Sequence, residues 1–408
     1  MTVRVCMAID RFYPLGGGAE SHAYHLSKQL QSRGIQVVVI TRQVEPDLAK
    51  FEVQEGLTIY RVPPIGLRSH FVVFVVFFTF LWALWKHRNE YDLLHTHDPR
   101  TIYLAAMIIH KLTGKPLVSK VMINGDLSWP ESIRIRKTLY SELVRRVFMP
   151  KSLWYRLLKQ SSAWVAISDD IRKELEECGL SHLTHSISNA IDVTRFHPVT
   201  EKEKFELRTK LNLPLNKTII ISHGRITEQK RLDLLIEAIG RVKENYLDLY
   251  VVLPGNIQFE EKGIFENLQE QITNLGLSDL IHFPGRSNFV QEYLQASDIY
   301  IISSKFEGMS NALLEAMACG LPVISTAVSG ATDIIRDGQN GFIVPIGDAD
   351  VIADALRKYL SDMSSATISG KNAAQTIQEN YSWEQIIKKY IALYRELLTK
   401  NKLNSQIQ

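Results

Sequence analysis

Cysteine is scarce in this 408-residue sequence, and its three cysteines, Cys6, Cys178 and Cys319, lie far apart in apolar surroundings. This spacing excludes a disulfide framework and a zinc knuckle, and it favours a reducing compartment. Charge of one sign is not in excess either, because 47 basic residues stand against 44 acidic ones. The net charge of +3 therefore gives no electrostatic reason to expect nucleic-acid binding.

A secretory leader and a membrane-spanning run are also missing. Residues 1–10 enter a short apolar strand at once, without the length or cleavage site of a signal peptide, which predicts a cytosolic protein. The apolar run at residues 71–85 is shorter than the roughly 20 residues that a membrane span requires.

That run allows two interpretations. It is a buried crossover helix, or it is a helix that partly enters a bilayer surface, with Phe77, Phe78 and Trp82 as apolar anchors. The second interpretation is supported by residues 134–159, where arginine and lysine alternate with aliphatic and aromatic residues. In that segment Arg145 and Arg146 are the candidates for contact with anionic lipid.

The sequence does contain enough apolar residues, 45%, for two domains that each bury a core. Short apolar runs alternate with helical patterns along the whole chain, which predicts an α/β fold with parallel sheets. After residue 349 the pattern is mostly helical to residue 398.

The most informative stretch spans residues 304–322. An apolar strand at residues 299–302 leads into a polar turn, and residues 312–319 predict a helix that Gly320 and Pro322 stop. The backbone N–H groups at such a helix start, together with the helix dipole, suit an anion such as a diphosphate. These donors are expected from Gly308, Met309, Ser310 and Asn311.

Two carboxylates flank this anion site. Glu307 precedes the helix and Glu315 lies about one turn inside it. Carboxylates repel a phosphate but accept hydrogen bonds from sugar hydroxyls, so the inferred ligand is a sugar nucleotide. The plain alternative is an exposed loop residue and a solvated helix face. The segment around Glu315 is too apolar for a solvated face, and an ionised group there needs a partner.

With the Ala-Cys-Gly-Leu-Pro-Val segment that follows, this E-x7-E spacing resembles the retaining glycosyltransferases of family four. Three further segments resemble the same family in the same order along the chain. They are the Gly-Arg…Lys segment at residues 222–231, the Asn-Gly-Phe-Ile-Val segment at residues 340–344, and residues 188–198 at the domain junction.

The resemblance implies the GT-B fold, in which two Rossmann-like doubly wound domains face each other across a cleft. We expect the first domain at residues 1–190 with a returning helix at 383–400, the second at 191–382, and a frayed tail at 401–408. The resemblance also implies retention at the anomeric carbon and no required metal. We find no Asp-x-Asp pair placed to bind a divalent ion.

Roles follow for individual residues of the second domain. Arg225 and Lys230 would neutralise the charge that develops on the departing diphosphate, and Gly224 belongs to the same segment. By resemblance, Glu315 holds the ribose of the nucleotide and Glu307 the hydroxyls of the sugar.

Candidates in the first domain lie after apolar strands, where open α/β sheets bind ligands. Gly16 and Gly17 belong to a glycine-rich turn that resembles the donor-facing loop of the family. His97 and Asp98 follow another strand and are site candidates, with a capping role as the alternative. Many relatives carry a histidine where this chain has Asn124, and Asp126 is expected to take part of that role.

The sequence thus predicts an enzyme that transfers a sugar from a nucleotide diphosphate sugar to an acceptor hydroxyl. The acceptor is expected to be a lipid-linked saccharide or glycolipid of cell-envelope polysaccharide synthesis, used on the inner face of the plasma membrane. Two alternatives stay open. They are a sugar-nucleotide epimerase on the same fold and a non-catalytic, membrane-associated protein that binds sugar nucleotides.

Overall fold

The computed structural model describes residues 3–14, 17–65, 72–97, 99–125, 127, 151–257 and 262–407. The chain divides into two compact units. Unit 1 comprises Met1–Asn189 and Ile386–Gln408, and unit 2 comprises Ala190–Gln385. The first crossing between the units therefore lies one residue before the expected boundary.

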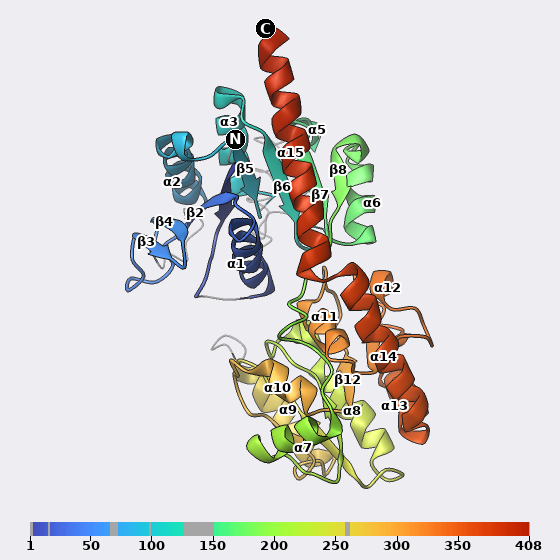
Figure 1. Cartoon of the computed structure of the whole chain (residues 1–408). Helices are drawn as coiled ribbons and strands as arrows, with labels where there is room; N and C mark the ends of the chain where they lie inside the picture. Colours follow the sequence, from blue (N-terminus) through green and yellow to red (C-terminus); the bar gives the residue numbers. More distant parts are fainter. Residues whose placement is uncertain are drawn as a thin grey trace. The chain divides into compact units, whose positions relative to one another are not determined.

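Unit 1 is built on an eight-stranded sheet (Figure 1). In spatial order its strands are β3 (Phe51–Gln54), β4 (Leu57–Val62), β2 (Gln36–Arg42), β1 (Arg4–Ile9), β5 (Leu93–Thr96), β6 (Leu117–Val121), β7 (Ala163–Ala166) and β8 (Thr184–Ser186). All neighbours pair in parallel except β3, which runs antiparallel to β4. The central strands β1, β5 and β6 are buried on both sides because helices cover both faces of the sheet.

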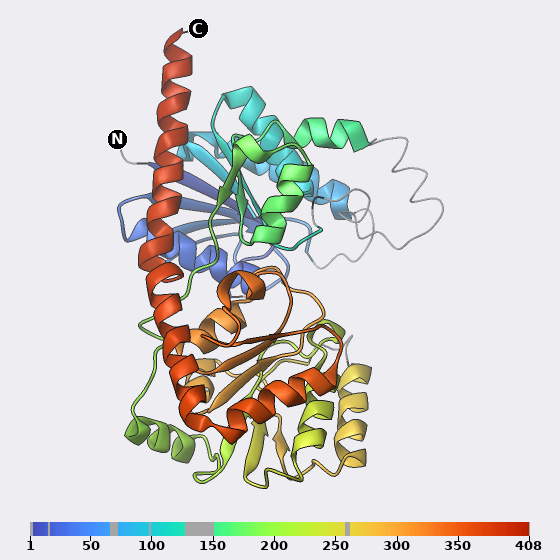
Figure 2. The same cartoon turned by 90° about the vertical axis from the view of Figure 1, so that its right-hand side faces the viewer.

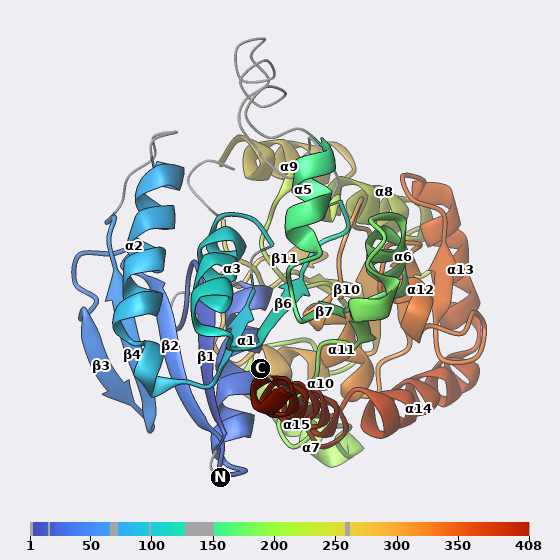
Figure 3. The same cartoon turned by 90° about the horizontal axis from the view of Figure 1, so that it is seen from above.

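The helices of unit 1 are α1 (Gly18–Gln31), α2 (Val72–Lys86), α3 (Thr101–Thr113), α5 (Lys151–Leu158) and α6 (Asp169–Glu177). Figure 3 shows α2 beside α3 on one face of the sheet, with α1 on the other face. This arrangement follows from right-handed crossovers between parallel strands.

Unit 2 has a six-stranded, wholly parallel sheet with helices on both faces (Figure 2). Its strands, in spatial order, are β11 (Ile281–His282), β10 (Leu249–Val252), β9 (Thr218–Ile221), β12 (Ile299–Ile302), β13 (Val323–Thr326) and β14 (Phe342–Val344). Its helices are α7 (Glu201–Lys210), α8 (Leu232–Val242), α9 (Lys262–Asn274), α10 (Val290–Gln295), α11 (Asn311–Ala318), α12 (Ala331–Ile334), α13 (Ala349–Ser361) and α14 (Met363–Asn380). The prediction of two doubly wound α/β domains is confirmed.

Helix α15 (Trp383–Ile407) begins in unit 2 and continues into unit 1. In unit 1 it buries Tyr390 and Tyr394 completely. The helix extends to Ile407, beyond residue 401, where the sequence predicts a frayed tail to begin. Residues 399–407 contain neither glycine nor proline, so nothing in the sequence stops the helix earlier.

Candidate active site

The sheet of unit 2 reverses its winding direction between β9 and β12. From β9 the chain proceeds to β10 and β11 on one side, whereas β12, β13 and β14 lie on the other side. The loops that follow the carboxyl ends of β9 and β12 therefore diverge from adjacent strands. In open α/β sheets a ligand binds at such a switch point.

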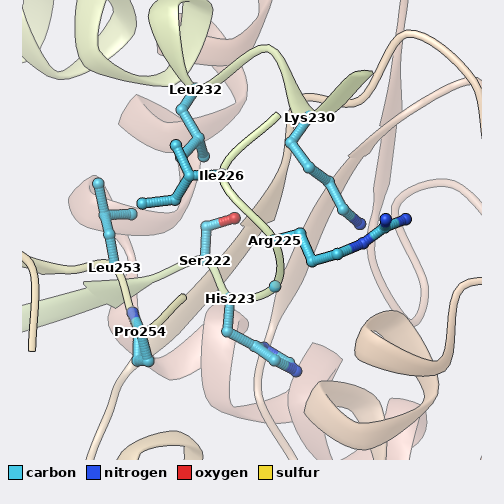
Figure 4. Close-up of a pocket in the computed structure, with 9 residues that line it drawn as sticks. Ser222, His223, Arg225, Ile226, Lys230, Leu232, Leu253 and Pro254 are labelled. Carbon is cyan, nitrogen blue, oxygen red and sulfur yellow. The ribbon is translucent and has the colours of Figure 1, made fainter. Parts of the chain in front are cut away.

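The loop after β9 forms a pocket at this point (Figure 4). Its lining residues are Ser222, His223, Gly224, Arg225, Ile226, Lys230, Leu232, Leu253 and Pro254. Gly224 has φ +135°, a value that side-chain-bearing residues rarely adopt. Close packing adds a second constraint, because a Cβ on Gly255 would lie 2.3 Å from the Gly224 carbonyl oxygen.

Lys230 and Arg225 point to the same side of this loop in Figure 4, but their surroundings differ. Lys230 Nζ lies 2.7 Å from Glu307 Oε1, which also accepts a hydrogen bond from Ser304 Oγ at 2.8 Å. Arg225 is exposed, and we find no ion-pair partner for it within the described chain. The pocket thus offers one cation already paired and one available to an anion.

Hydrogen bonds join the loops after β9 and β12. Ser303 Oγ donates to the Lys230 carbonyl at 2.9 Å, and Lys305 N donates to the Gln229 carbonyl at 2.8 Å. Gln229 Nε2 donates to the Phe306 carbonyl at 2.8 Å. These bonds hold the residue pair Lys230 and Glu307, 77 positions apart in sequence, in contact.

Close packing against Gly330 and capping by Ser310 fix the turn before α11. Gly330 has φ +77°, and a Cβ there would lie 2.5 Å from the Gly308 carbonyl oxygen. Ser310 is the N-cap of α11, with its side chain accepting from Leu313 N at 3.4 Å. Gly308, Met309 and Ser310 are buried at this helix start.

Glu315 forms the second contact that the sequence alone did not reveal. Its Oε2 lies 2.7 Å from Nε2 of His223, which belongs to the loop after β9. The side chain of Glu315 is 20% exposed and that of His223 is 7% exposed. The expectation that this carboxylate needs a partner is met by His223, which sequence reasoning missed because a lone histidine before a glycine carries no pattern.

Unit 1 holds the remaining candidates. Gly17 N donates to Glu20 Oε2 at 3.0 Å at the start of α1. Asn124 is exposed after β6. Gly16, Asp98, Asp126, Arg145 and Arg146 lie outside the described residues.

His97 belongs to a buried basic cluster, which we define as His22, His95, His97 and Lys120. Lys120 Nζ lies 3.1 Å from His22 Nδ1 and 3.0 Å from Asn189 Oδ1. His95 Nδ1 lies 2.7 Å from the Tyr394 hydroxyl of α15, and its ring stacks on His97 with centroids 4.5 Å apart. Neither ring nitrogen of His97 has a hydrogen-bond partner in the part of the chain that the structure describes.

Burial dominates the ionisation of this cluster. It lowers the pKa of His95 to about 3 and holds the pKa of His22 and of His97 well below the usual value. It also holds the pKa of Lys120 well below that of a solvated lysine. The mutual repulsion of these basic groups acts on the three histidines in the same direction.

Helix α2 buries one side against the core and exposes apolar residues on the other side. Val76, Phe80, Ala83 and Leu84 face the core, whereas an aromatic strip lies on the exposed side. This strip consists of Val73, Phe74, Phe78, Trp82 and Trp85. Phe77 is only partly exposed. The cations of Lys86 and Arg88 lie over the Trp82 and Trp85 rings, at 4.7 and 4.3 Å from the ring centroids.

Three general features complete the description. All three cysteines are buried and lie outside any disulfide. Within the described ranges, no helix combines the length and apolar character needed to cross a bilayer. The same residues contain no group of histidine, cysteine and carboxylate side chains that could hold a metal ion.

Comparison with known families assigns both units. Residues 16–195 match the model of Glycosyltransferase Family 4, and residues 203–376 match that of Glycosyl transferases group 1. The two matches leave only short segments uncovered. The chain belongs to glycosyltransferase family 4. The expectation of an enzyme of the glycosyltransferase class is thereby confirmed.

Some relatives of this family 4 glycosyltransferase match nearly its whole length, and others match about half of it. An uncharacterised glycosyltransferase of Methanocaldococcus jannaschii is 26% identical over 96% of this chain and 98% of its own. The lipopolysaccharide core biosynthesis glycosyltransferase LpsE of Rhizobium meliloti is 34% identical over 46% of this chain and 52% of its own. The solved structure of Anabaena HepE in complex with UDP-glucose has a TM-score of 0.75 at 20% identity, covering 97% of this chain and 99% of that chain.

Proposed function

We propose that this glycosyltransferase moves a sugar from a nucleotide diphosphate sugar to an acceptor hydroxyl, with retention at the anomeric carbon and without a metal. The observation that carries the proposal is the pocket at the switch point of unit 2. There an available cation, Arg225, lies in the same loop as Lys230, which is paired with Glu307 of the loop after β12. The UDP-glucose named in the HepE structure supports a donor of this class.

The reaction breaks the bond between the anomeric carbon and the diphosphate, so negative charge develops on the departing phosphate oxygen. Arg225 and Lys230 would stabilise that charge, which is the largest contribution the protein can make without a metal. Glu307 would accept hydrogen bonds from sugar hydroxyls, and Glu315 from the ribose. The start of α11 would add backbone donors to the phosphates.

A screen of nucleotide sugars by thermal shift tests the donor. A ligand present at 100 times its dissociation constant adds about 2.7 kcal/mol of stability. Release of nucleoside diphosphate that increases when an acceptor is added would support transfer over epimerisation, since an epimerase releases none. The relatives named above are transferases, so neither the epimerase nor the non-catalytic alternative is favoured.

For the acceptor, we propose a lipid-linked saccharide or glycolipid of the cell envelope, reached from the cytoplasmic face of the plasma membrane. The lipopolysaccharide core synthesis named for LpsE supports an envelope acceptor. The aromatic strip of α2 supports membrane contact, because its apolar side chains end at two cations suited to anionic headgroups.

Sedimentation with anionic liposomes tests the membrane contact. We expect binding at low salt that weakens as salt is added, and a loss of binding in a Phe78→Ser and Trp82→Ser double variant. Phe289→Ser, which changes an equally exposed aromatic residue of unit 2, is the matched control. Charge reversal at Arg145 and Arg146 should also release the protein while donor hydrolysis continues. Wild-type protein that stays in the supernatant would contradict the membrane proposal.

A further inference from the structure

His223 has an unusual set of partners for a nearly buried histidine. Its Nε2 lies 2.7 Å from Glu315 Oε2, and its ring lies against Tyr300 with centroids 5.5 Å apart. Its Nδ1 is buried and has no hydrogen-bond partner among the residues that the structure describes. A buried nitrogen without a partner costs stability, so an apolar side chain would fill this space at lower cost. The contact with Glu315 is therefore what the histidine contributes.

The contact constrains the carboxylate. Because Nε2–H donates to Oε2, the carboxyl group of Glu315 cannot rotate freely, and Oε1 is left to accept from a ligand. An oxygen held in one place can accept from two adjacent hydroxyls of a ribose. A 2′-deoxyribose offers it one hydroxyl and leaves it partly unpaired, which disfavours the deoxy ligand.

We propose that His223 is a positioning residue that fixes Glu315 against the ribose diol, so that the enzyme selects ribonucleoside diphosphate sugars over deoxythymidine diphosphate sugars. This inference rests on the proposed donor site and narrows its substrate class. It assigns the selection to an interaction between two protein side chains, and not to Glu315 alone.

The test measures a ratio of affinities inside each variant. Titration calorimetry would compare UDP with 2′-deoxy-UDP, GDP with 2′-deoxy-GDP and ADP with 2′-deoxy-ADP. For the base that binds, we expect wild type to prefer the ribonucleotide by roughly tenfold or more, the usual range for a hydrogen bond to a charged group. His223→Leu should bring this preference to about twofold or less, whereas His223→Gln, whose amide N–H can still donate, should keep most of it.

Two further variants make the result decisive. His223→Asn is polar but too short to reach Glu315, so it should lose the preference as His223→Leu does, even if the leucine variant folds poorly. His282→Leu removes an exposed histidine of β11 and should behave as wild type. A general loss of affinity cancels in the ratio, whereas a lost positioning contact does not.

The outcomes separate this inference from the function on which it rests. If wild type binds a nucleoside diphosphate and His223→Leu and His223→Asn keep its full preference, the positioning role is overturned and the donor site stands. If wild type binds the ribonucleotide and the 2′-deoxynucleotide equally, the proposed selection is overturned and the proposed donor site stands. If wild type binds deoxythymidine diphosphate and none of the three pairs, the selection is overturned and the donor site stands. If it binds neither deoxythymidine diphosphate nor any of the three pairs, the proposed donor fails, and this inference fails with it.

Discussion

The two units treat their basic side chains in opposite ways. In unit 2, Lys230 and His223 each lie 2.7 Å from a carboxylate, at the edge of a pocket that solvent reaches. In unit 1, the buried basic cluster places Lys120 Nζ 3.0 Å from Asn189 Oδ1 and 3.1 Å from His22 Nδ1, and His95 Nδ1 2.7 Å from the Tyr394 hydroxyl. At such a pocket Lys230 can exchange its carboxylate partner for an anionic ligand. In the buried basic cluster, burial favours the neutral form of the histidines and of Lys120, and the cost appears as a dependence of stability on pH.

The largest expected effect is the loss of the cations in unit 2. Arg225→Ala or Lys230→Ala should lower turnover by roughly a hundredfold or more, because one donor aimed at developing charge contributes about 2.7 to 4 kcal/mol. Steady-state kinetics checks this, with circular dichroism to show that the fold is retained. Lys371→Ala removes an exposed lysine of α14 and is the matched control. Near-normal turnover in both pocket variants would remove the basis of the comparison.

The next effect concerns acid stability in unit 1. The unfolded chain binds a proton on each histidine below about pH 6.5, whereas the folded chain keeps His95 neutral down to about pH 3. The contribution of the histidines to stability is therefore complete above pH 6.5 and falls as the pH decreases, by about 1.4 kcal/mol per pH unit for each neutral histidine. Lys120 has the same sign at higher pH, since its pKa is also lowered.

Urea unfolding between pH 7 and pH 5 measures this slope. His97→Gln removes one of the neutral histidines and should reduce the slope by about 1.4 kcal/mol per pH unit. His182→Gln changes an exposed histidine of the same unit and should leave the slope unchanged. A slope that His97→Gln does not alter would show that His97 gains its proton in the folded protein.

The pocket of unit 2 and the buried basic cluster of unit 1 also show which features can be predicted from the sequence and which cannot. The strands β4 and β12 follow directly from apolar runs, and the loops after β9 and β12 follow from segments that resemble a known family. The pairs Lys230–Glu307 and His223–Glu315 could not be predicted, because they depend on β9 and β12 being neighbours in space. Periodicity within a segment carries no information on which strands are adjacent.

Lys120 illustrates the same limit. In the segment Leu-Val-Ser-Lys-Val, a lysine in a strand normally indicates a solvated edge, yet Lys120 is fully buried. Its burial arises because α1 and α15 cover the sheet there, and α15 comes from the far end of the chain. The antiparallel strand β3 was also missed, because four residues with exposed Phe51 and Val53 carry too little signal.

A smaller effect separates the two carboxylates of the pocket. Glu315→Gln should weaken binding of the free nucleoside diphosphate by about tenfold, as expected for a charged acceptor that becomes neutral. Glu307→Gln should reduce sugar transfer more than it reduces nucleoside diphosphate binding. Calorimetry and turnover assays on both variants check this division. Equal binding of the nucleoside diphosphate to Glu315→Gln and wild type would contradict the ribose role.

The smallest expected effect is that of salt, which should act on ligand binding in unit 2 and not on the buried basic cluster of unit 1. Screening reaches exposed charges, with a Debye length of about 10 Å at 0.1 M, but acts much less on buried groups. Raising sodium chloride should therefore weaken nucleoside diphosphate binding severalfold through Arg225. The acid slope from the buried basic cluster should stay nearly constant. A slope that changes with salt as much as the binding does would show that the cluster is open to solvent.

Helix α15 has a consequence for the order in which the protein is made. Tyr394, which contacts His95, follows the whole of unit 2 in the chain. During synthesis on the ribosome, residues 3–189 therefore lack α15 until the whole of unit 2 has been made. Unit 2 is contiguous and can complete its sheet first, although domains generally fold from the N-terminus. The earlier half of the polypeptide thus becomes the later half to finish folding, and its sheet without the cover of α15 is the species that chaperones would meet.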